Sequence, residues 1–433
     1  MPVDPQLVRL RFPVLALALL FAQACAGRQA AATAPTSPPG TTPLPSPVPP
    51  GPRIFLHAPD VLAGHKARWK AQWMLDQQHP EPALARLFDD ARKALAEMPF
   101  SVTEKNVLPP SGDKHDYLSL APYAWPDPRK PDGLPYIMRD GQINPERDSI
   151  PDHAYFSRLV TLTETLGLAY YFTGDEAFAK HAALLLRTFF VEPTTRMNPN
   201  LNFAQGVRGK DAGRPAGIID TAGMARLIDG FGLLSDAQAL SPEDRAGLLG
   251  WFRDYLSWLR DSDLGHKEGQ AKNNHGIWYD VQVVSLALAT GQVELARETL
   301  QFSRKRRIGR QIDPEGRQPE ELQRTRSWHY SIYSLQAFVA LAGMGERAGV
   351  DLWRYQTPDG RSMRKAVEWL IPFALGDKPW TTPEIGGFTP EALWPIVREA
   401  AARLQDPTLA AAATRLGAHL GAQSTDRLWL LIE

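Results

Sequence analysis

The chain has 433 residues, and its 48 Lys and Arg residues are matched by 48 Asp and Glu residues. Because the formal net charge is zero, no global field attracts the protein to nucleic acid or to an anionic membrane surface, and an anionic ligand must be recognised by a local cluster. The apolar fraction of 43% is sufficient for a large core and excludes a wholly disordered chain.

The segment 1–24 is predicted to be a signal peptide. Arg9 and Arg11 precede an apolar run that is too short to span a bilayer comfortably and ends in the small-x-small sequence Ala-Gln-Ala. Cys25, the single cysteine, follows at once and is a candidate lipidation site, so a secreted protein and a lipid-anchored lipoprotein are both open. Either way we expect export to the periplasm or cell envelope, with no internal disulfide and no membrane span.

The segment 25–52 is rich in Pro, Thr and Ser and carries almost no charge. Such a stretch cannot bury enough apolar surface to fold, and its prolines stiffen it. We therefore predict a linker here and a folded domain over residues 53–433.

Most of this domain has the three- and four-residue apolar spacing of amphipathic helices. Residues 156–172, for example, carry Leu159, Leu162 and Leu166 at this spacing and end at a Thr-Gly-Asp turn. Strand signals are few and fall at 53–58 and 134–143. The chain is therefore predicted to be all-α. Further helices are predicted over 176–190, 218–234, 242–260, 276–289, 293–308, 322–343, 363–375 and 391–404.

Two short segments resemble each other, TGDEAFAK over 173–180 and TGQVELAR over 290–297. Each joins the end of one predicted helix to the start of the next, and glycine suits the end of a helix. Repeated helix hairpins with short turns indicate a toroid or solenoid of paired helices. Two similar turns that arose by chance are the alternative.

The stretch 108–150 is long, weakly periodic and rich in Pro, Gly, Asp and aromatic residues, and loops of this kind are usually functional. Aromatic rings pack on the C–H groups of a sugar while polar groups fix its hydroxyls. A loop held to the domain by its own aromatic side chains is the alternative. The candidate sugar contacts in this stretch are Lys114, His115, Tyr117, Tyr123 and Trp125.

The sequence QAKNNHGIWYDVQ places two asparagines and His275 before an apolar helix. Asn273 or Asn274 can cap a helix that begins near Gly276, and the positive end of that helix favours a docked carboxylate. An amide and His275 would then face one ligand, with Trp278 in the next turn as a further contact. Plain capping beside a hydrogen-bonded histidine is the alternative.

The sequence RTRSWHYSIYSL brings arginines and tyrosines together. If it is helical, Arg326, Tyr330 and Tyr333 fall at i, i+4 and i+7 on one face. A phenol near an arginine can have a pKa below its usual value, which suits proton transfer. Arg324 and Tyr330 are further candidate substrate contacts. A tyrosine stripe packed under a neighbouring helix is the alternative.

Taken together, these groups indicate a reaction. The sequence contains no Ser-His-Asp motif, phosphate-binding loop or HExxH motif, and its histidines are too scattered to indicate a metal, so no cofactor is predicted. An amide, a histidine, an arginine and tyrosines match β-elimination on a uronic acid polymer. Arg and Asn would neutralise the carboxylate, His or Tyr would take the C5 proton, and Tyr would protonate the leaving oxygen.

Four motifs resemble, in this order, those of the alginate lyase family: PPSGDKHDYLSLAPYAWPDP, KPDGLPYIMRDGQINPE, KNNHGIWYDVQ and QPEELQRTRSWHYSIY. The resemblance spans about residues 55–400, nearly the whole of the predicted folded domain. It implies an incomplete (α/α) toroid of helix hairpins and a metal-independent polysaccharide lyase of the bacterial periplasm or cell envelope. The domain 53–433 is then an alginate-lyase-like catalytic domain that acts on an anionic polysaccharide, and we expect a monomer.

The resemblance also implies roles for single residues. Asn274 and Arg326 look like the residues that neutralise the carboxylate, and His275 and Tyr333 look like the catalytic histidine and tyrosine. Lys114, Tyr117 and Trp125 would be the sugar contacts. The chain departs from well-characterised alginate lyases in the Gly-Ile-Trp that follows Asn-Asn-His and in its second arginine and second tyrosine. It thus resembles a broader branch of the family, which leaves the polymer open.

Two other functions remain as alternatives. A glycoside hydrolase on the same toroid needs two opposed carboxylates. A non-catalytic envelope protein that binds polysaccharide would keep the aromatic side chains but would not need His275 or Tyr333. The carboxylates available for a hydrolase are Asp116, Asp152, Glu320 and Glu321.

Overall fold

The computed structural model describes residues 53–56, 58–75 and 82–419. The predicted signal peptide, Cys25 and the linker lie outside the described residues, so they stay predictions, as do export and the monomeric state. Within the described residues, none of the helices is both long and apolar enough to cross a membrane.

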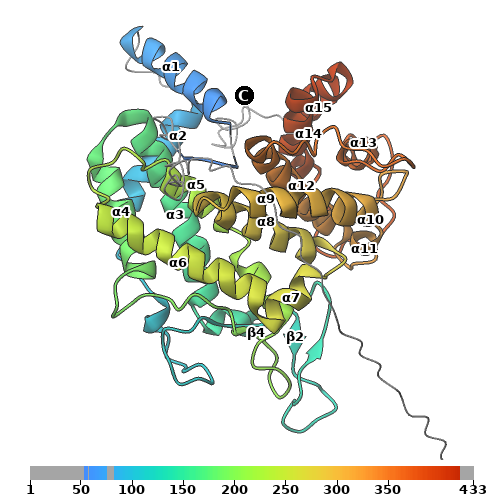
Figure 1. Ribbon diagram of the computed structural model, residues 1–433. Helices are drawn as coiled ribbons and strands as arrows, with labels where there is room; N and C mark the ends of the chain where they lie inside the picture. Colours follow the sequence, from blue (N-terminus) through green and yellow to red (C-terminus); the bar gives the residue numbers. More distant parts are fainter. Residues whose placement is uncertain (1–52, 57, 76–81, 420–433) are drawn as a thin grey trace, which may run out of the picture. The chain divides into compact units, whose positions relative to one another are not determined.

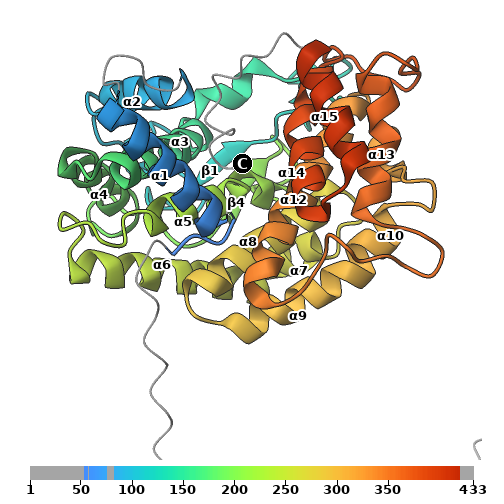
Figure 2. The same cartoon turned by 90° about the horizontal axis from the view of Figure 1, so that it is seen from above.

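Two layers of helices build the unit 51–433 (Figures 1 and 2). Along the inner layer each helix packs on the next, and four of the inner helices pair with an outer helix that follows them in the chain. This arrangement confirms the all-α, incomplete (α/α) toroid of helix hairpins. The inner helices are α3 (Asp152–Thr173), α5 (Met224–Gly232), α8 (Asn274–Ala289), α12 (Ser327–Ala348) and α14 (Trp394–Leu404). The outer helices are α4 (Glu176–Phe190), α6 (Pro242–Asp261), α9 (Val293–Ser303), α13 (Met363–Ala374) and α15 (Pro407–His419).

The division into layers follows from the distribution of apolar side chains. Helix α8 is buried on nearly every side, and its second half, from Val281 to Ala289, is almost entirely apolar. Helix α4 instead buries one stripe that includes Ala179, Leu186 and Phe189, and it exposes the opposite face. Gly174 and Gly291 connect the layers with φ values of 73° and 78°, a left-handed conformation that favours glycine. The repeated TG segments are therefore equivalent turns between inner and outer helices.

Several predicted boundaries were wrong. The predicted helix 218–234 is divided into the 3-10 segment η3 (Pro215–Thr221) and α5, and the predicted helix 293–308 ends in the π-helical segment η4 (Arg304–Ile308) before α10 (Gly309–Gln311). The predicted helix 322–343 begins later, because Leu322 belongs to α11 (Pro319–Leu322). The remaining helical elements are α1 (Pro59–Leu75), α2 (Pro82–Ala94), η1 (Val102–Glu104), η2 (Pro145–Ser149), α7 (Asp263–Gly269) and η5 (Pro390–Leu393).

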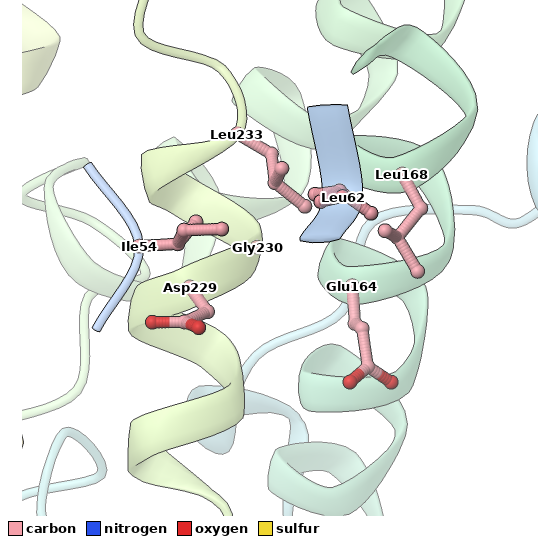
Figure 3. A pocket seen from close by; sticks show the side chains of 7 residues that line it. All are labelled: Ile54, Leu62, Glu164, Leu168, Asp229, Gly230 and Leu233. Atoms are coloured by element: carbon pink, nitrogen blue, oxygen red, sulfur yellow. The ribbon is translucent and has the colours of Figure 1, made fainter. Parts of the chain in front are cut away.

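The predicted strand at 53–58 was also wrong for its described residues. The backbone N–H groups of Phe55 and Leu56 donate to the carboxylate of Asp229 on α5, at 2.8 and 3.0 Å, instead of to a neighbouring strand. This segment crosses α5 so closely that a Cβ at Gly232 would lie 2.0 Å from the carbonyl oxygen of Arg53. Beside it is a cavity of about 10 Å³, roughly the space for one water, lined by four apolar side chains and two carboxylates (Figure 3).

Two small sheets lie at the end of the helices where α7 is found (Figure 1). Strand β1 (Leu118–Leu120) pairs in parallel with β4 (Phe203–Gly206), and β2 (Ala124–Trp125) pairs antiparallel with β3 (Ile137–Met138). The predicted strand within 134–143 is thus confirmed as β3. Behind β1, Lys105 Nζ lies 2.9 Å from Asp152 Oδ2, and both side chains are fully buried. Lys105 Nζ also donates to the carbonyl oxygen of Lys114 at 2.8 Å, and the N–H of Leu118 donates to Asp152 at 2.9 Å, so the pair fastens the long loop 108–150 to the first turn of α3.

Candidate active site

The first turn of α8 is held from behind by a carboxylate. Asn273 is the N-cap residue and accepts from the N–H of His275, so the helix begins at Asn274 and not at Gly276 as predicted. The backbone N–H and Nδ2 of Asn274 donate to Glu321 at 2.6 and 2.8 Å, and burial raises the pKa of Glu321 despite these bonds. Asn274 is 0% exposed, so the expected direct contact with a substrate carboxylate is not available. Asn274 positions the start of α8 instead.

His275 is oriented by Glu268, a buried residue on α7. The distance from His275 Nδ1 to Glu268 Oε1 is 2.6 Å, and an Nδ1–H that donates to this carboxylate leaves the lone pair on Nε2. His275 is half-buried, and its Nε2 has no protein partner among the described residues. The turn before it is fixed by Arg307, which donates to the carbonyl oxygens of Gly269 and Ala271. Sequence reasoning missed Glu268, because nothing in the pattern links it to the histidine.

Arg326 lies at the N-cap position of α12 with an unpaired guanidinium. The N-terminus of this helix is capped by Glu384, which accepts from the N–H of His329 at 3.0 Å. Glu384 belongs to the segment 382–389, which crosses Arg326. The crossing is so close that a Cβ at Gly386 would lie 2.4 Å from Arg326 Nε. Within the described part of the chain no carboxylate forms an ion pair with Arg326, and its buried Nε has no hydrogen-bond partner. The guanidinium is therefore covered on one side by Gly386 and has no counter-ion among the described residues.

Tyr333 joins α12 to α8. Its ring packs against Trp278 with a centroid distance of 4.9 Å and stacks in parallel with His329 at 6.1 Å. The hydroxyl has no hydrogen-bond partner among residues 53–56, 58–75 and 82–419. Burial, with smaller contributions from Asp220 and Tyr123, raises the pKa of Tyr333 well above its usual value. Tyr333 is therefore a protonated phenol at neutral pH, which can donate a proton without prior ionisation.

The second arginine and tyrosine of the motif are closed off. The hydroxyl of Tyr330 is hydrogen-bonded to that of Tyr123, and the guanidinium of Arg324 covers the Tyr330 ring at 3.7 Å from its centroid. Arg324 also donates from Nε to Asp140 Oδ1 at 3.0 Å. We expected a nearby arginine to lower a phenol pKa, but burial and the bond to Tyr123 raise the pKa of Tyr330 despite Arg324. Burial therefore has a larger effect on the pKa of Tyr330 than the charge of Arg324 has.

Sequence reasoning missed two more residues at this site. His329 precedes Tyr333 by one helical turn, so the spacing alone could have placed it on the same face. Asp220 on η3 accepts from Tyr117, Ser119 and the Nε2 of Gln205, at 3.0, 2.6 and 2.6 Å. No sequence signal identified Asp220, because two of its three partners, Tyr117 and Ser119, lie 103 and 101 residues earlier in the chain.

The predicted contacts in the loop 108–150 have different surroundings. Tyr117 is 0% exposed and donates to Asp220, so its prediction as a sugar contact was wrong. Trp125 is half-buried and stays a candidate. Its Nε1 donates to the backbone carbonyl oxygen of Gln142, and the guanidinium of Arg139 lies over its ring. His115 donates from Nδ1 to the carbonyl oxygen of Arg196, and Lys114 is exposed. None of the hydrogen bonds of these two residues is made with a residue of α8 or α12.

A family model described as alginate lyase matches residues 101–380, a range that contains all four motifs. No curated protein matches the chain by sequence. The crystal structure of an alginate lyase from Bacteroides ovatus is 35% identical, with 88% of this chain and 100% of that chain covered and a TM-score of 0.83.

Alginate lyase A1-III from Sphingomonas species A1 is 15% identical, with 91% of this chain and 99% of that chain covered and a TM-score of 0.52. A histidine-to-alanine variant of A1-III complexed with tetrasaccharide is 16% identical, with 86% and 93% covered and a TM-score of 0.53. At this identity the two A1-III structures show a shared fold and no more. Among the described residues, no cluster of three or more His, Cys, Asp or Glu side chains is placed to hold a metal ion.

Proposed function

The chain belongs to the alginate lyase family of polysaccharide lyases, and we propose that it cleaves alginate or a related polyuronate by β-elimination, which leaves a 4,5-unsaturated uronate at the new end. One observation carries this proposal. His275 Nε2, the Arg326 guanidinium and the Tyr333 hydroxyl have no protein partner among the described residues, while Glu268 and Glu384 hold the elements behind them. A base, an anion receptor and an acid are the groups that β-elimination requires.

The proposed reaction begins at the uronate carboxylate, which Arg326 neutralises. This makes the C5 proton more acidic, because the negative charge left at C5 is delocalised into the carboxylate. A base removes that proton, the C4–O bond breaks with its electron pair on the glycosidic oxygen, and the double bond forms between C4 and C5. Tyr333 gives its proton to the departing oxygen, so one proton leaves C5 and one arrives at the leaving group.

The structure supports His275 as the base in a mechanism where the base and the acid are two different residues. Glu268 fixes the imidazole with the Nε2 lone pair available, and Tyr333 begins as a phenol because burial raises its pKa. On guluronate, the C5 proton and the leaving oxygen lie on opposite sides, which suits this division between His275 and Tyr333. On mannuronate both lie on one side, so Tyr333 would serve both steps and must first lose its proton.

The hydrolase alternative loses support from the positions of its carboxylates. Asp116 accepts from Ser111, Asn198 and Asn200, at 2.7, 2.9 and 3.1 Å. Asp152 is buried against Lys105, and Glu321 is bound to Asn274. Glu320 alone of the four is exposed, and a pair is needed.

The test is ultraviolet absorbance over time with the purified chain, a metal chelator and a panel of poly-mannuronate, poly-guluronate, polyglucuronate, hyaluronan and pectate. Rising absorbance with one polymer, lost in Tyr333→Phe and kept in Tyr330→Phe, is the expected result. Tyr330→Phe is a matched control, because it removes a hydroxyl from the same face of α12. Constant absorbance with new reducing ends would establish hydrolysis instead, and no cleavage of any polymer would contradict both enzyme readings for this panel.

A further inference from the structure

A third arginine, Arg214, is held beside the candidate site by a neutral residue. Its Nε donates to the backbone carbonyl oxygen of Gln205 at 3.0 Å, and its Nη2 donates to the side-chain oxygen of the same residue at 2.7 Å. Both acceptors are uncharged, and Nη1 makes no hydrogen bond to the described residues. The guanidinium is thus oriented by two bonds without being neutralised.

Two other half-buried arginines of this fold are neutralised by a carboxylate. Arg187 is paired with Asp244, and Arg226 with Glu164. Arg214 has no carboxylate at ion-pair distance within the described part of the chain, although it is withdrawn from water. Desolvation lowers the pKa of Arg214 below its usual range, opposed by the more distant Asp220, Glu268 and Asp211. A desolvated guanidinium without a counter-ion is a ready receptor for an anion.

The residue that holds Arg214 has a strained backbone. Gln205, at the end of β4, has φ of 48°, a conformation uncommon for a residue other than glycine. All its polar groups are engaged: its N–H donates to Ser119 at 2.8 Å, and its Nε2 donates to Asp220 at 2.6 Å. Such strain persists where the surroundings fix it, and it is concentrated at functional sites. Here it directs the amide oxygen and the backbone carbonyl toward one guanidinium.

The neighbours of Arg214 connect it to the proposed reaction. Glu268, which lies within electrostatic range of Arg214, is the residue that orients His275. Asp220, which is also within range, acts on the pKa of Tyr333. Arg214 lies on the segment between β4 and η3 and is linked to Asp220 through the side chain of Gln205, whereas Arg326 is the N-cap residue of α12.

We propose that Arg214 binds the carboxylate of a uronate next to the one that Arg326 neutralises, so that this enzyme requires consecutive uronates. The inference rests on the proposed function and deepens it. In a polyuronate every sugar carries a carboxylate, so two arginines can be satisfied at once. In a polymer that alternates uronate with a neutral amino sugar, such as hyaluronan, Arg214 would be left desolvated and without an anion.

The test compares Arg214→Ala, Arg214→Lys and the unchanged chain on the polyuronate that the lyase cleaves best. Arg214→Ala should raise KM at least about tenfold with kcat changed less than about threefold, and Arg214→Lys should recover part of the loss, because a point charge replaces a bidentate group. Hyaluronan, added as a competitor, should inhibit Arg214→Ala and the unchanged chain equally. The proposal is overturned if Arg214→Ala leaves KM unchanged. It is also overturned if Arg214→Ala weakens the binding of polyuronate and of hyaluronan equally.

Arg245→Ala is the matched control, because Arg245 is also half-buried and donates to the backbone carbonyl oxygens of Leu234 and Ser235, away from the site. It should lower the melting temperature without changing KM. If Arg214→Ala also lowers the melting temperature and loses kcat at constant KM, Arg214 only clamps Gln205 and the proposal fails. If the unchanged chain cleaves nothing, calorimetric titration with polyuronate still decides, because equal binding by Arg214→Ala would contradict the arginine proposal independently of the reaction.

Discussion

Two arginine–tyrosine pairs at the start of α12 differ in one respect. Arg324 and Tyr330 are closed by Asp140 and Tyr123, whereas Arg326 and Tyr333 are left open. Both pairs come from one short motif, and both closing residues come from the loop 108–150. We infer from this that the loop, and not helical spacing alone, decides which arginine and which tyrosine of the proposed site can meet a substrate.

The largest effect should come from Tyr333. Replacing it with Phe removes the proposed acid, so kcat should fall about 10²- to 10⁴-fold, the usual contribution of a positioned acid or base. Tyr330→Phe should lower kcat less than about tenfold, because its hydroxyl is bonded to Tyr123 and not directed to a substrate. Initial rates of unsaturated product formation measure both. Equal losses would remove the distinction between open and closed pairs.

The second largest effect should come from a substitution at Arg326. Arg326→Ala removes the receptor for the scissile carboxylate, and we expect kcat/KM to fall about 10²- to 10³-fold, as for loss of one group that stabilises a developing anion. The melting temperature should change little, because no ion pair is lost among the described residues. Arg324→Ala should do the reverse, with a smaller kinetic loss and a lower melting temperature. Steady-state kinetics and thermal unfolding of both variants separate these outcomes.

A substitution at Glu268 tests the proposed role of His275 indirectly, because Glu268 orients the imidazole. Glu268→Gln keeps the shape of the side chain but removes the charge that orients His275, so kcat should fall up to about 10²-fold on guluronate blocks, where His275 is the proposed base. The loss on mannuronate blocks should be smaller. Comparable losses on both blocks would show that His275 has the same role for either epimer.

The pH dependence should distinguish the epimers further. Because burial raises the pKa of Tyr333, the phenolate is scarce at neutral pH, and its fraction grows up to about tenfold per pH unit as pH rises towards that pKa. On mannuronate blocks, where Tyr333 must start as phenolate, kcat/KM should therefore rise into the alkaline range. On guluronate blocks the profile should be flatter. Identical profiles in Tyr333→Phe and the unchanged chain would contradict this assignment.

The same contrast explains what the sequence could reveal. Apolar spacing identified α4 with its observed bounds, and the TG segments identified the turns at Gly174 and Gly291, because these features depend on neighbours in the chain. Residue identity and spacing also selected His275, Arg326 and Tyr333, which lie on or beside the adjacent helices α8 and α12. The burial of Tyr117 and three of the carboxylates behind the site could not be predicted, because they depend on contacts between segments far apart in sequence. Glu268 lies only seven residues before His275, but its contact depends on the turn between α7 and α8, which the sequence pattern did not indicate. The carboxylates are Glu268, Glu321, Glu384 and Asp220.

The smallest effect should come from opening the closed pair. Although burial opposes it, hydrogen bonds from Arg324 and Thr325 hold the pKa of Asp140 below its usual value. A lowered folded-state pKa stabilises the fold above the unfolded pKa of about 3.9 and stops doing so as pH falls through the folded value. Because the pair is partly exposed, Asp140→Asn should lower the free energy of unfolding by only about 1 kcal/mol at pH 7, and by less in acid. Urea unfolding across pH 3–7 measures this. A difference that grows in acid would show that the charge of Asp140 does not close the pair.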